Sequence, residues 1–248
     1  MINLSFVNKA KNMVKGLKEK PIYLYTREES EHFEGYIKRN FGEYTKVFHE
    51  FYSPDVHVDI LIIPPTEKSN YYKLITMGAG AYKMNVPDEI QEYDLDRAEF
   101  VAFLPPDWDM TEKNSKYNWV INELQTLCRI AIDENGRVGF GHTIGYEANA
   151  PLTKYANFSS LILLSAQVET EGYSVDLKLP NKGTINFYQI FPLYKEEVDY
   201  VKTNGVESLP KIIPDPENFI PIIDINRENY CEEMLLNKTE ELEEEIEK

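Results

Sequence analysis

The alternation of hydrophobic and polar positions is clearest between residues 96 and 143. The run 96–104 becomes steadily more apolar, which predicts a core strand, and Pro105-Pro106 ends it because proline cannot donate to a sheet ladder. Residues 117–130 then carry apolar side chains at helical spacing. We therefore expect a core strand that leads into a core helix, followed by turns at Gly136 and Gly141.

Further strands and a helix are predicted before this stretch. In residues 56–63, the side chains at 56, 58, 60 and 62 point to one face and those at 57, 59, 61 and 63 to the other, because strand residues alternate. Aromatic and β-branched residues predict strands over 22–25, 44–52 and 71–77. Residues 28–40 carry apolar side chains on one side and precede Gly42, which predicts a helix with a glycine stop.

The C-terminal half predicts three more strands and a second long helix. Residues 159–168, 173–179 and 184–191 are separated by turn residues, which predicts an antiparallel meander. A helix is expected from residue 195 to Gly205, which closes it. Four prolines between 210 and 221 then predict an irregular, extended segment with one short strand at 220–225.

The two ends of the chain differ from the domain between them, which we place at residues 21–228. Residues 1–20 hold five lysines among apolar residues at helical intervals, which predicts a basic helix that packs on the domain or on a partner, or alternatively lies on a membrane surface. Residues 229–248 form an acidic tail, in which eight glutamates and two lysines give a charge of −6. We expect this tail to be a solvated helix or, alternatively, an acidic arm for a basic partner.

Composition restricts the class of partner and the location. The formal net charge of the 248 residues is −16, which disfavours nucleic acid and anionic lipid and favours a cationic protein partner. Cys128 and Cys231 form neither a disulfide framework nor a metal motif, and Cys128 is expected to be a small core residue. No stretch approaches the ~20 apolar residues of a membrane span, and the N-terminus lacks a signal-peptide block. The expected location is the cytoplasm.

Few residues point to catalysis. His57 and Asp59 share one face of a predicted strand and His49 lies one strand earlier, so they form either a metal site or a structural pair in the sheet. The sequence Gly78-Ala79-Gly80 resembles the start of a dinucleotide loop but lacks its third glycine. His142 lies in a glycine-rich loop, yet no serine or cysteine occupies a nucleophile-elbow context beside it. We expect no catalytic residue, no metal and no cofactor.

Several segments, in order and spacing, together resemble the suppressor of fused family in its bacterial form, over roughly residues 40 to 228. They include 57–60, 74–78, 97–108, 119–127, 141–144, 187–194, Glu196-Glu197 and Arg227. The resemblance implies an α+β domain with a mixed, largely antiparallel sheet and packed helices, and it implies no catalysis. The animal relatives grip a short peptide of a transcription factor, whereas the bacterial relatives look like immunity proteins that neutralise a toxin.

The resemblance also implies a binding region. The peptide-gripping part of the family corresponds to the end of the 117–130 helix and to the segment before His142, so Ile130, Gly141 and His142 are the expected partner-binding residues. The leading hypothesis is an immunity protein for a basic protein toxin, such as a nuclease. The alternatives are a regulator that adds a peptide strand to its sheet edge and an enzyme that uses His49, His57, Asp59 or His142.

Overall fold

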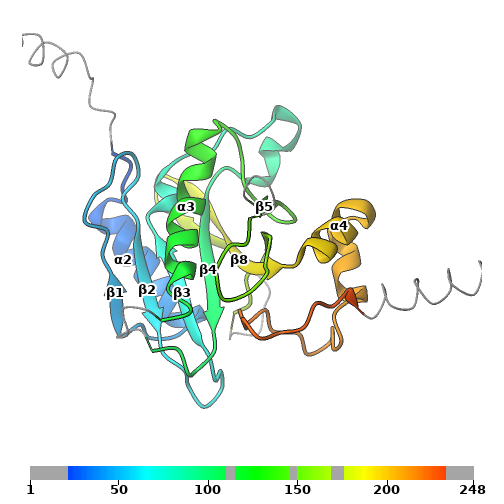
Figure 1. Ribbon diagram of the computed structural model, residues 1–248. Helices are drawn as coiled ribbons and strands as arrows, with labels where there is room; N and C mark the ends of the chain where they lie inside the picture. The colour runs from blue at the N-terminus through cyan, green and yellow to red at the C-terminus, as the bar shows by residue number, and fades with distance from the viewer. Residues whose placement is uncertain (1–21, 110–114, 146–149, 169–175, 233–248) are drawn as a thin grey trace, which may run out of the picture.

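Residues 22–109, 115–145, 150–168 and 176–232 are described by the structure, a computed structural model (Figure 1). Its strands are β1 (Lys46–Phe48), β2 (Asp59–Ile63), β3 (Tyr72–Met77), β4 (Ala98–Leu104), β5 (Thr143–Gly145), β6 (Ser160–Ser165), β7 (Asp176–Leu179) and β8 (Gly183–Leu193). The α-helices are α2 (Arg27–Asn40), α3 (Trp119–Asp133) and α4 (Lys195–Asn204). Short 3-10 helices are η1 (Ala79–Ala81), η2 (Asp88–Tyr93) and η4 (Val206–Lys211).

The strands of the described chain form one sheet in the order β1-β2-β3-β4-β8-β6-β5, with β7 paired to β8 beside this path. The β4–β8 pairing is parallel and the other pairings are antiparallel. This arrangement confirms the predicted α+β class with a mixed, largely antiparallel sheet. No helix within the described ranges is long and apolar enough to cross a membrane.

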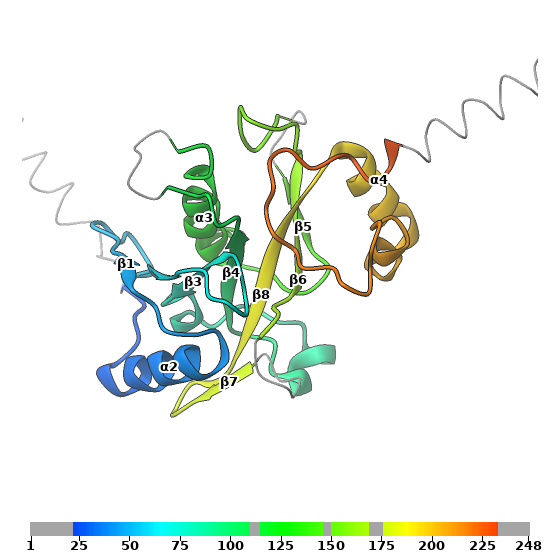
Figure 2. The ribbon, with the colours of Figure 1, turned by 90° about the horizontal axis from the view of Figure 1, so that it is seen from below.

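The sheet has α3 on one face and α2 on the other (Figures 1 and 2). In β2, Ile60 and Ile62 belong to the hydrophobic cluster around α3, whereas Leu61 and Ile63 belong to the cluster around α2. The alternation predicted over 56–63 is therefore confirmed. Because both faces are covered, a strand at the centre of this sheet is apolar on both sides.

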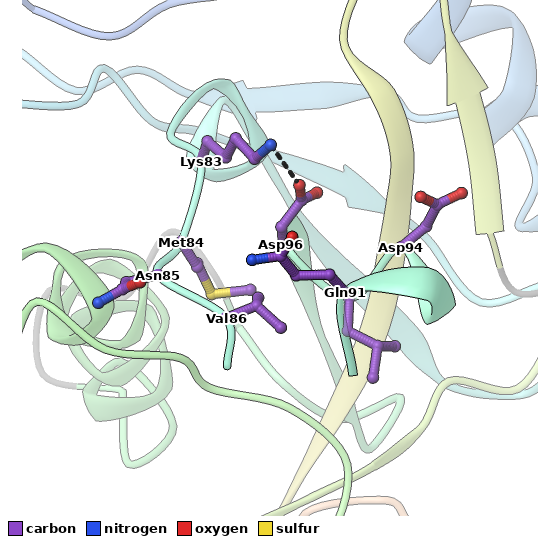
Figure 3. Close-up of a pocket in the computed structure, with 8 residues that line it drawn as sticks. Lys83, Met84, Asn85, Val86, Gln91, Asp94 and Asp96 are labelled. Carbon is purple, nitrogen blue, oxygen red and sulfur yellow. Dashed lines mark ion pairs between the residues drawn. The ribbon is translucent and has the colours of Figure 1, made fainter. Parts of the chain in front are cut away.

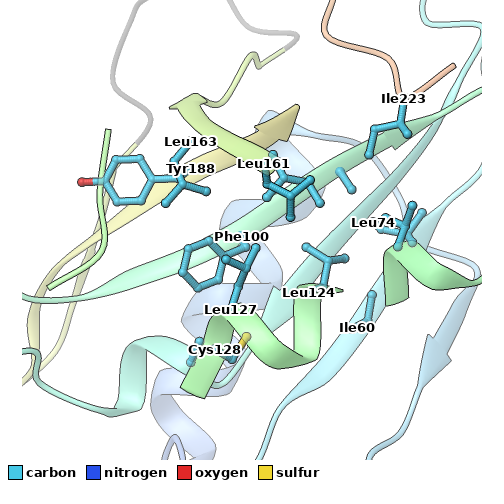
Figure 4. Packing of buried hydrophobic residues seen from close by; sticks show 14 of the residues in the cluster. Ile60, Leu74, Phe100, Leu124, Leu127, Cys128, Leu161, Leu163, Tyr188 and Ile223 are labelled. Atoms are coloured by element: carbon cyan, nitrogen blue, oxygen red, sulfur yellow. The ribbon is translucent and has the colours of Figure 1, made fainter. Parts of the chain in front are cut away.

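The central strand and helix follow the sequence prediction closely. All seven residues of β4 are buried. On α3, Leu124, Leu127 and Cys128 point toward the sheet, as Figure 4 shows, and the expected core position of Cys128 is confirmed. The predicted helix at 28–40 is α2, which begins with a capping box of Thr26 and Glu29 and is followed by Gly42 at φ 113°.

A third hydrophobic cluster joins α4 and η4 to the end of the sheet. Phe191 and Leu193 of β8 pack there against Val198 and Val201 of α4. Gly205 ends α4, as predicted.

Three predicted strands are reduced to three residues or to a single bridge. Residues 22–25 contribute only an isolated bridge between Tyr23 and Val56, because the N-cap of α2 follows at Thr26. The strand predicted at 44–52 is limited to β1. The strand predicted at 220–225 contributes only a bridge between Ile222 and Phe103, since the preceding Pro221 has no N–H for a ladder.

The predicted antiparallel meander is also wrong in its order. Asn186 pairs with Ala98 and with Asp176, and Gln189 pairs with Val101 and with Leu164. Since Asn186 and Gln189 both pair with β4 on one side, β6 and β7 must share the other edge of β8. The eleven residues of β8 are long enough to pair with both, so β7 does not lie between β6 and β8 (Figure 2).

A buried carboxylate organises the centre of the sheet. Glu99 of β4 has no exposed surface, and it accepts hydrogen bonds from the hydroxyls of Tyr25 (2.7 Å) and Thr76 (2.6 Å). It also accepts hydrogen bonds from the backbone N–H groups of Gly78 (2.8 Å) and Gly80 (3.0 Å). Burial raises the pKa of Glu99 to about 7, and the four hydrogen bonds, which favour the charged form, oppose that rise.

A buried ion pair fixes the C-terminal part of the domain. Both guanidinium ends of Arg227 bind Glu197, at 2.6 and 2.7 Å, and Glu197 has no exposed surface. The rings of Phe158, Phe191, Tyr194 and Tyr230 surround the guanidinium, with centroids 4.6 to 5.1 Å from its Cζ atom. Arg227 thereby ties the last described segment to α4 and β8.

The pH dependence of stability is expected to contain a contribution from Glu99. Its pKa in the fold exceeds its ordinary value of 4.5, so the folded state holds the proton more tightly than the unfolded state between these two values. Stability from this residue is therefore greatest below about pH 4.5 and falls by about 3 kcal/mol as the pH rises to 7 and above. Denaturation of the native chain and of Glu99→Gln at several pH values measures the difference between their free energies of unfolding. As the pH rises, the native chain should lose stability relative to Glu99→Gln. A difference independent of pH would contradict it.

The pair of Arg227 and Glu197 is expected to be strongly coupled. Each of Arg227→Met and Glu197→Gln leaves a buried polar partner unmatched, and each should cost about 3 kcal/mol or more of unfolding free energy. The double variant should lose clearly less than the sum of the two single losses. Chemical denaturation of the four proteins gives the coupling energy, and strictly additive losses would show that the pair acts as two independent residues.

Candidate functional site

A pocket of about 480 Å³ lies where the end of α3 meets the start of β5. Ile130, Gly141 and His142, the residues expected to bind a partner, all line it, so the structure brings the three together. Their role in binding remains a prediction. The volume lies in the range of ligand pockets, roughly 300 to 1,000 Å³.

The floor of the pocket is apolar and its rim is polar. Ala131 and Val138 are buried in the cluster around α3, and Ile130 and Ile144 pack against that cluster while remaining partly exposed. Glu134, Arg137, His142 and Thr143 supply the polar groups of the lining. An apolar floor with a few polar groups suits the binding of a side chain whose end carries a charge or a hydrogen-bonding group.

Gly141 directs the chain into β5 through a tight turn and a β-bulge. Its φ is +78°, and His142 donates its N–H to the carbonyl of Gly139, which closes the turn. Gly141 donates its N–H to the carbonyl of Leu163 (2.8 Å), and Leu163 donates its N–H to the carbonyl of His142 (3.0 Å). Gly141 and His142 thus lie opposite the single residue Leu163, which is the arrangement of a β-bulge. The bulge fixes the side of the strand from which His142 projects.

His142 is the neutral member of a polar pair in the pocket. Its Nε2 atom lies 3.4 Å from Nη2 of Arg137. Burial lowers the pKa of His142, and the positive charge of Arg137 lowers it further. The imidazole is therefore uncharged near pH 7, and Arg137 is the positive group of the pair.

The outer edge of β5 is open. β5 pairs with β6 through Thr143 and Ile162, Ile144 and Leu161, and Gly145 and Ser160, and it is the last strand of the sheet. Among the described residues, no strand pairs with its other side. In an antiparallel pair of strands, hydrogen-bonded and non-hydrogen-bonded residue pairs alternate. Leu163 is hydrogen-bonded to the bulge, so Thr143 and Gly145 occupy non-hydrogen-bonded positions opposite β6. Their backbone N–H and C=O groups therefore point to the open edge.

The alternative site at His49, His57 and Asp59 is also assembled in the structure. Nδ1 of His49 and Nε2 of His57 lie 3.1 and 3.4 Å from the two carboxylate oxygens of Asp59. The other ring nitrogen of His57 lies 2.8 Å from the hydroxyl of Ser53. Within the described part of the chain, no group of three or more His, Cys, Asp and Glu side chains is arranged to hold a metal ion.

This polar cluster ties a loop to α3. Glu50 accepts hydrogen bonds from Ser53 (2.7 Å) and from Arg129 of α3 (2.7 Å), and Arg129 also pairs with Asp55 at 3.2 Å. Neither Glu50 nor Arg129 was predicted as a site residue. The two residues lie 79 positions apart in the chain, so no local pattern connects them.

The glycine loop at residues 78–80 has a structural explanation. Its N–H groups bind the carboxylate of Glu99, as described above, rather than face an open pocket. A Cβ atom at Gly78, whose φ is +128°, would lie 2.0 Å from the carbonyl oxygen of His57. The glycine therefore serves a close approach of two backbone segments.

A second, smaller pocket of about 260 Å³ lies between residues 83–86 and 91–96. Figure 3 shows Lys83 in an ion pair with Asp96 (3.1 Å) beside Met84 and Val86. Asn85 donates to the carbonyl of Asn135 (3.3 Å), in the turn that follows α3. The charges that line this pocket are thus partly paired within the chain.

Comparison with known proteins decides the family. The family model described as suppressor of fused protein matches residues 54–228. The chain belongs to the suppressor of fused family. The resemblance found in the sequence is therefore confirmed.

Three relatives show how far the likeness extends. An uncharacterized protein of Ureaplasma parvum serovar 3 is 28% identical over 212 residues, which cover 84% of this chain and 98% of the relative. The crystal structure of a suppressor of fused homolog from Neisseria gonorrhoeae has a TM-score of 0.54 at 16% identity, over 83% of this chain and 96% of the other. The crystal structure of a Sufu–Fu complex has a TM-score of 0.56 at 14% identity, over 84% and 93%. At such identities the two structures show the suppressor of fused fold alone.

Substitution of Gly141 is expected to destabilise the fold more than substitution of a positive-φ glycine that has free space around it. Gly141→Ala forces a side chain into a positive φ, which costs about 1–2 kcal/mol, and places Cβ 3.1 Å from Val206 of η4. Gly183→Ala is the matched control, because Gly183 has φ +91° and nothing lies within 4 Å of its added Cβ. Thermal unfolding of both should show the larger loss for Gly141→Ala. Equal losses would mean that the contact with Val206 has no effect.

Proposed function

We propose that this suppressor of fused domain is a non-catalytic protein-binding domain that acts as an immunity protein and neutralises a cognate toxin by direct contact. The observation that carries the proposal is the pocket of Ile130, Gly141 and His142 beside the open edge of β5. An apolar floor, a few polar groups and unpaired backbone positions are what an extended segment of another protein requires. Membership of a family with a crystal structure of a Sufu–Fu complex supports a protein partner.

The net charge supports a basic toxin, such as a nuclease with a positive cleft. A formal charge of −16 attracts a cationic protein over long range and raises the association rate, whereas the buried contacts determine how long the complex lasts. A cytoplasmic location is part of this proposal, since an immunity protein of this kind protects the cell that holds it.

A regulator that sequesters another protein of its own cell is the second candidate. It is favoured by the same open edge of β5, because a single peptide strand can pair there without a larger interface. An enzyme at His49, His57 and Asp59 has less support, because these side chains already bond to one another and to Ser53 within the loop.

Co-expression with the product of the neighbouring gene tests the immunity role. The full chain is expected to form a complex with that product and to restore growth of the cells that make it. Ile130→Glu places a charge on the apolar floor of the pocket and should weaken the complex by about tenfold or more. Thr126→Glu, on an exposed position one helical turn earlier, is the matched control and should leave binding and growth unchanged.

The outcomes separate the candidates. Absence of both a complex and growth protection contradicts the immunity role for that product. Capture of a non-toxic protein of the same cell, lost with Ile130→Glu and kept with Thr126→Glu, would support the regulator instead. Binding that is insensitive to Ile130→Glu would move the interface away from this pocket.

A further inference from the structure

We infer that Arg137 makes this pocket a receptor for a single carboxylate, carried by an extended peptide segment that pairs with the open edge of β5. The inference rests on the proposed function and names the chemistry of the segment that the pocket binds. The carboxylate is one anchoring group on the bound segment, and the partner as a whole can still be basic and attracted over long range by the negative charge of this chain.

The bonding of Arg137 differs from that of the other partly buried arginines. Within the described residues, Arg97 donates to three backbone carbonyls, Arg129 binds Glu50 and Asp55, and Arg227 binds Glu197. Arg137 is half-buried as well, yet it forms no ion pair with any carboxylate of the described chain, and its guanidinium contacts the ring of His142. A guanidinium that is partly buried loses hydration, and a bound anion would compensate for this loss through charge-assisted hydrogen bonds.

The backbone beside Arg137 is shaped to hold the guanidinium close. A Cβ atom at Gly139 would lie 2.5 Å from Nη1 of Arg137 and 3.3 Å from the hydroxyl of Tyr188. The absence of a side chain at Gly139 therefore leaves the space that the guanidinium occupies. Arg137 is thus positioned before a ligand arrives, which lowers the entropic cost of binding.

The surrounding groups favour one carboxylate rather than several. His142 is neutral, so Arg137 is the positive group among the residues that line the pocket. Glu134 lies on the same lining and repels a second acid. A peptide that lies along Thr143 and Gly145 can place one side chain, or its C-terminal carboxylate, over the floor formed by Ile130 and Ile144.

An array of short synthetic peptides tests the inference with the full-length chain. In each set one position is fixed in turn as Asp, Glu, Asn, Gln, Lys or Ala, and each peptide is made with a free and with an amidated C-terminus. Binding is expected to favour the sets with Asp or Glu, or the free C-terminus. The first result assigns a side-chain carboxylate and the second the chain end.

Two variants make the result specific. Arg137→Gln should weaken the selected peptides by about tenfold or more, as the loss of one charge-assisted bond implies. Arg39→Gln removes the same charge from an exposed position on α2 and should leave their affinity unchanged. Preference for Lys, equal binding of Asp and Asn, or insensitivity to Arg137→Gln would overturn the inference. Failure of every peptide to bind would also overturn it, while toxin neutralisation in the co-expression test would still stand.

Discussion

The structure depends on the burial of one carboxyl group in its central strand. Glu99 cannot reach water, so donors must come to it, and they come from Tyr25, Thr76 and the turn at Gly78–Gly80. These donors belong to the segment before α2, to β3 and to η1. A misplaced segment would leave a buried carboxylate short of a partner, which costs several kcal/mol. The carboxylate therefore selects one mutual arrangement of elements that hydrophobic burial alone would fix only loosely.

The candidate site is built on the rigid part that this carboxylate organises. Helix α3 packs on β4 and β2, and its last turn forms one wall of the pocket. The other wall is the turn and bulge at Gly141, which Leu163 of β6 holds by two backbone hydrogen bonds. A pocket whose walls are backbone and helix can present Arg137 and His142 in a fixed orientation.

Local periodicity accounts for what the sequence could predict. The strand at 98–104, the helix over 119–133 and the two faces of residues 56–63 each carry their pattern within one segment. The order of β6, β7 and β8 could not be predicted. Turn residues show where one strand ends and the next begins, but they do not show that β6 and β7 pair with the same edge of β8. The buried network of Glu99 could not be predicted, since its partner Tyr25 lies 74 residues away from it. In the pocket, Ile130, Gly141 and His142 were named from the family resemblance, whereas Arg137 gave no sequence signal.

The parallel pairing of β4 and β8 has a further consequence for how this family diversifies. Parallel neighbours cannot be joined by a hairpin, so the chain makes a long excursion through α3, β5, β6 and β7 between Leu104 and Gly183 before β8 pairs with β4. The pocket lies entirely on that excursion. Insertions and deletions in the loops of that excursion can alter the ligand surface while the register of β4 and β8 stays the same. Changes confined to those loops can thus alter which partner fits the pocket and leave the packing of α3 on the sheet as it is.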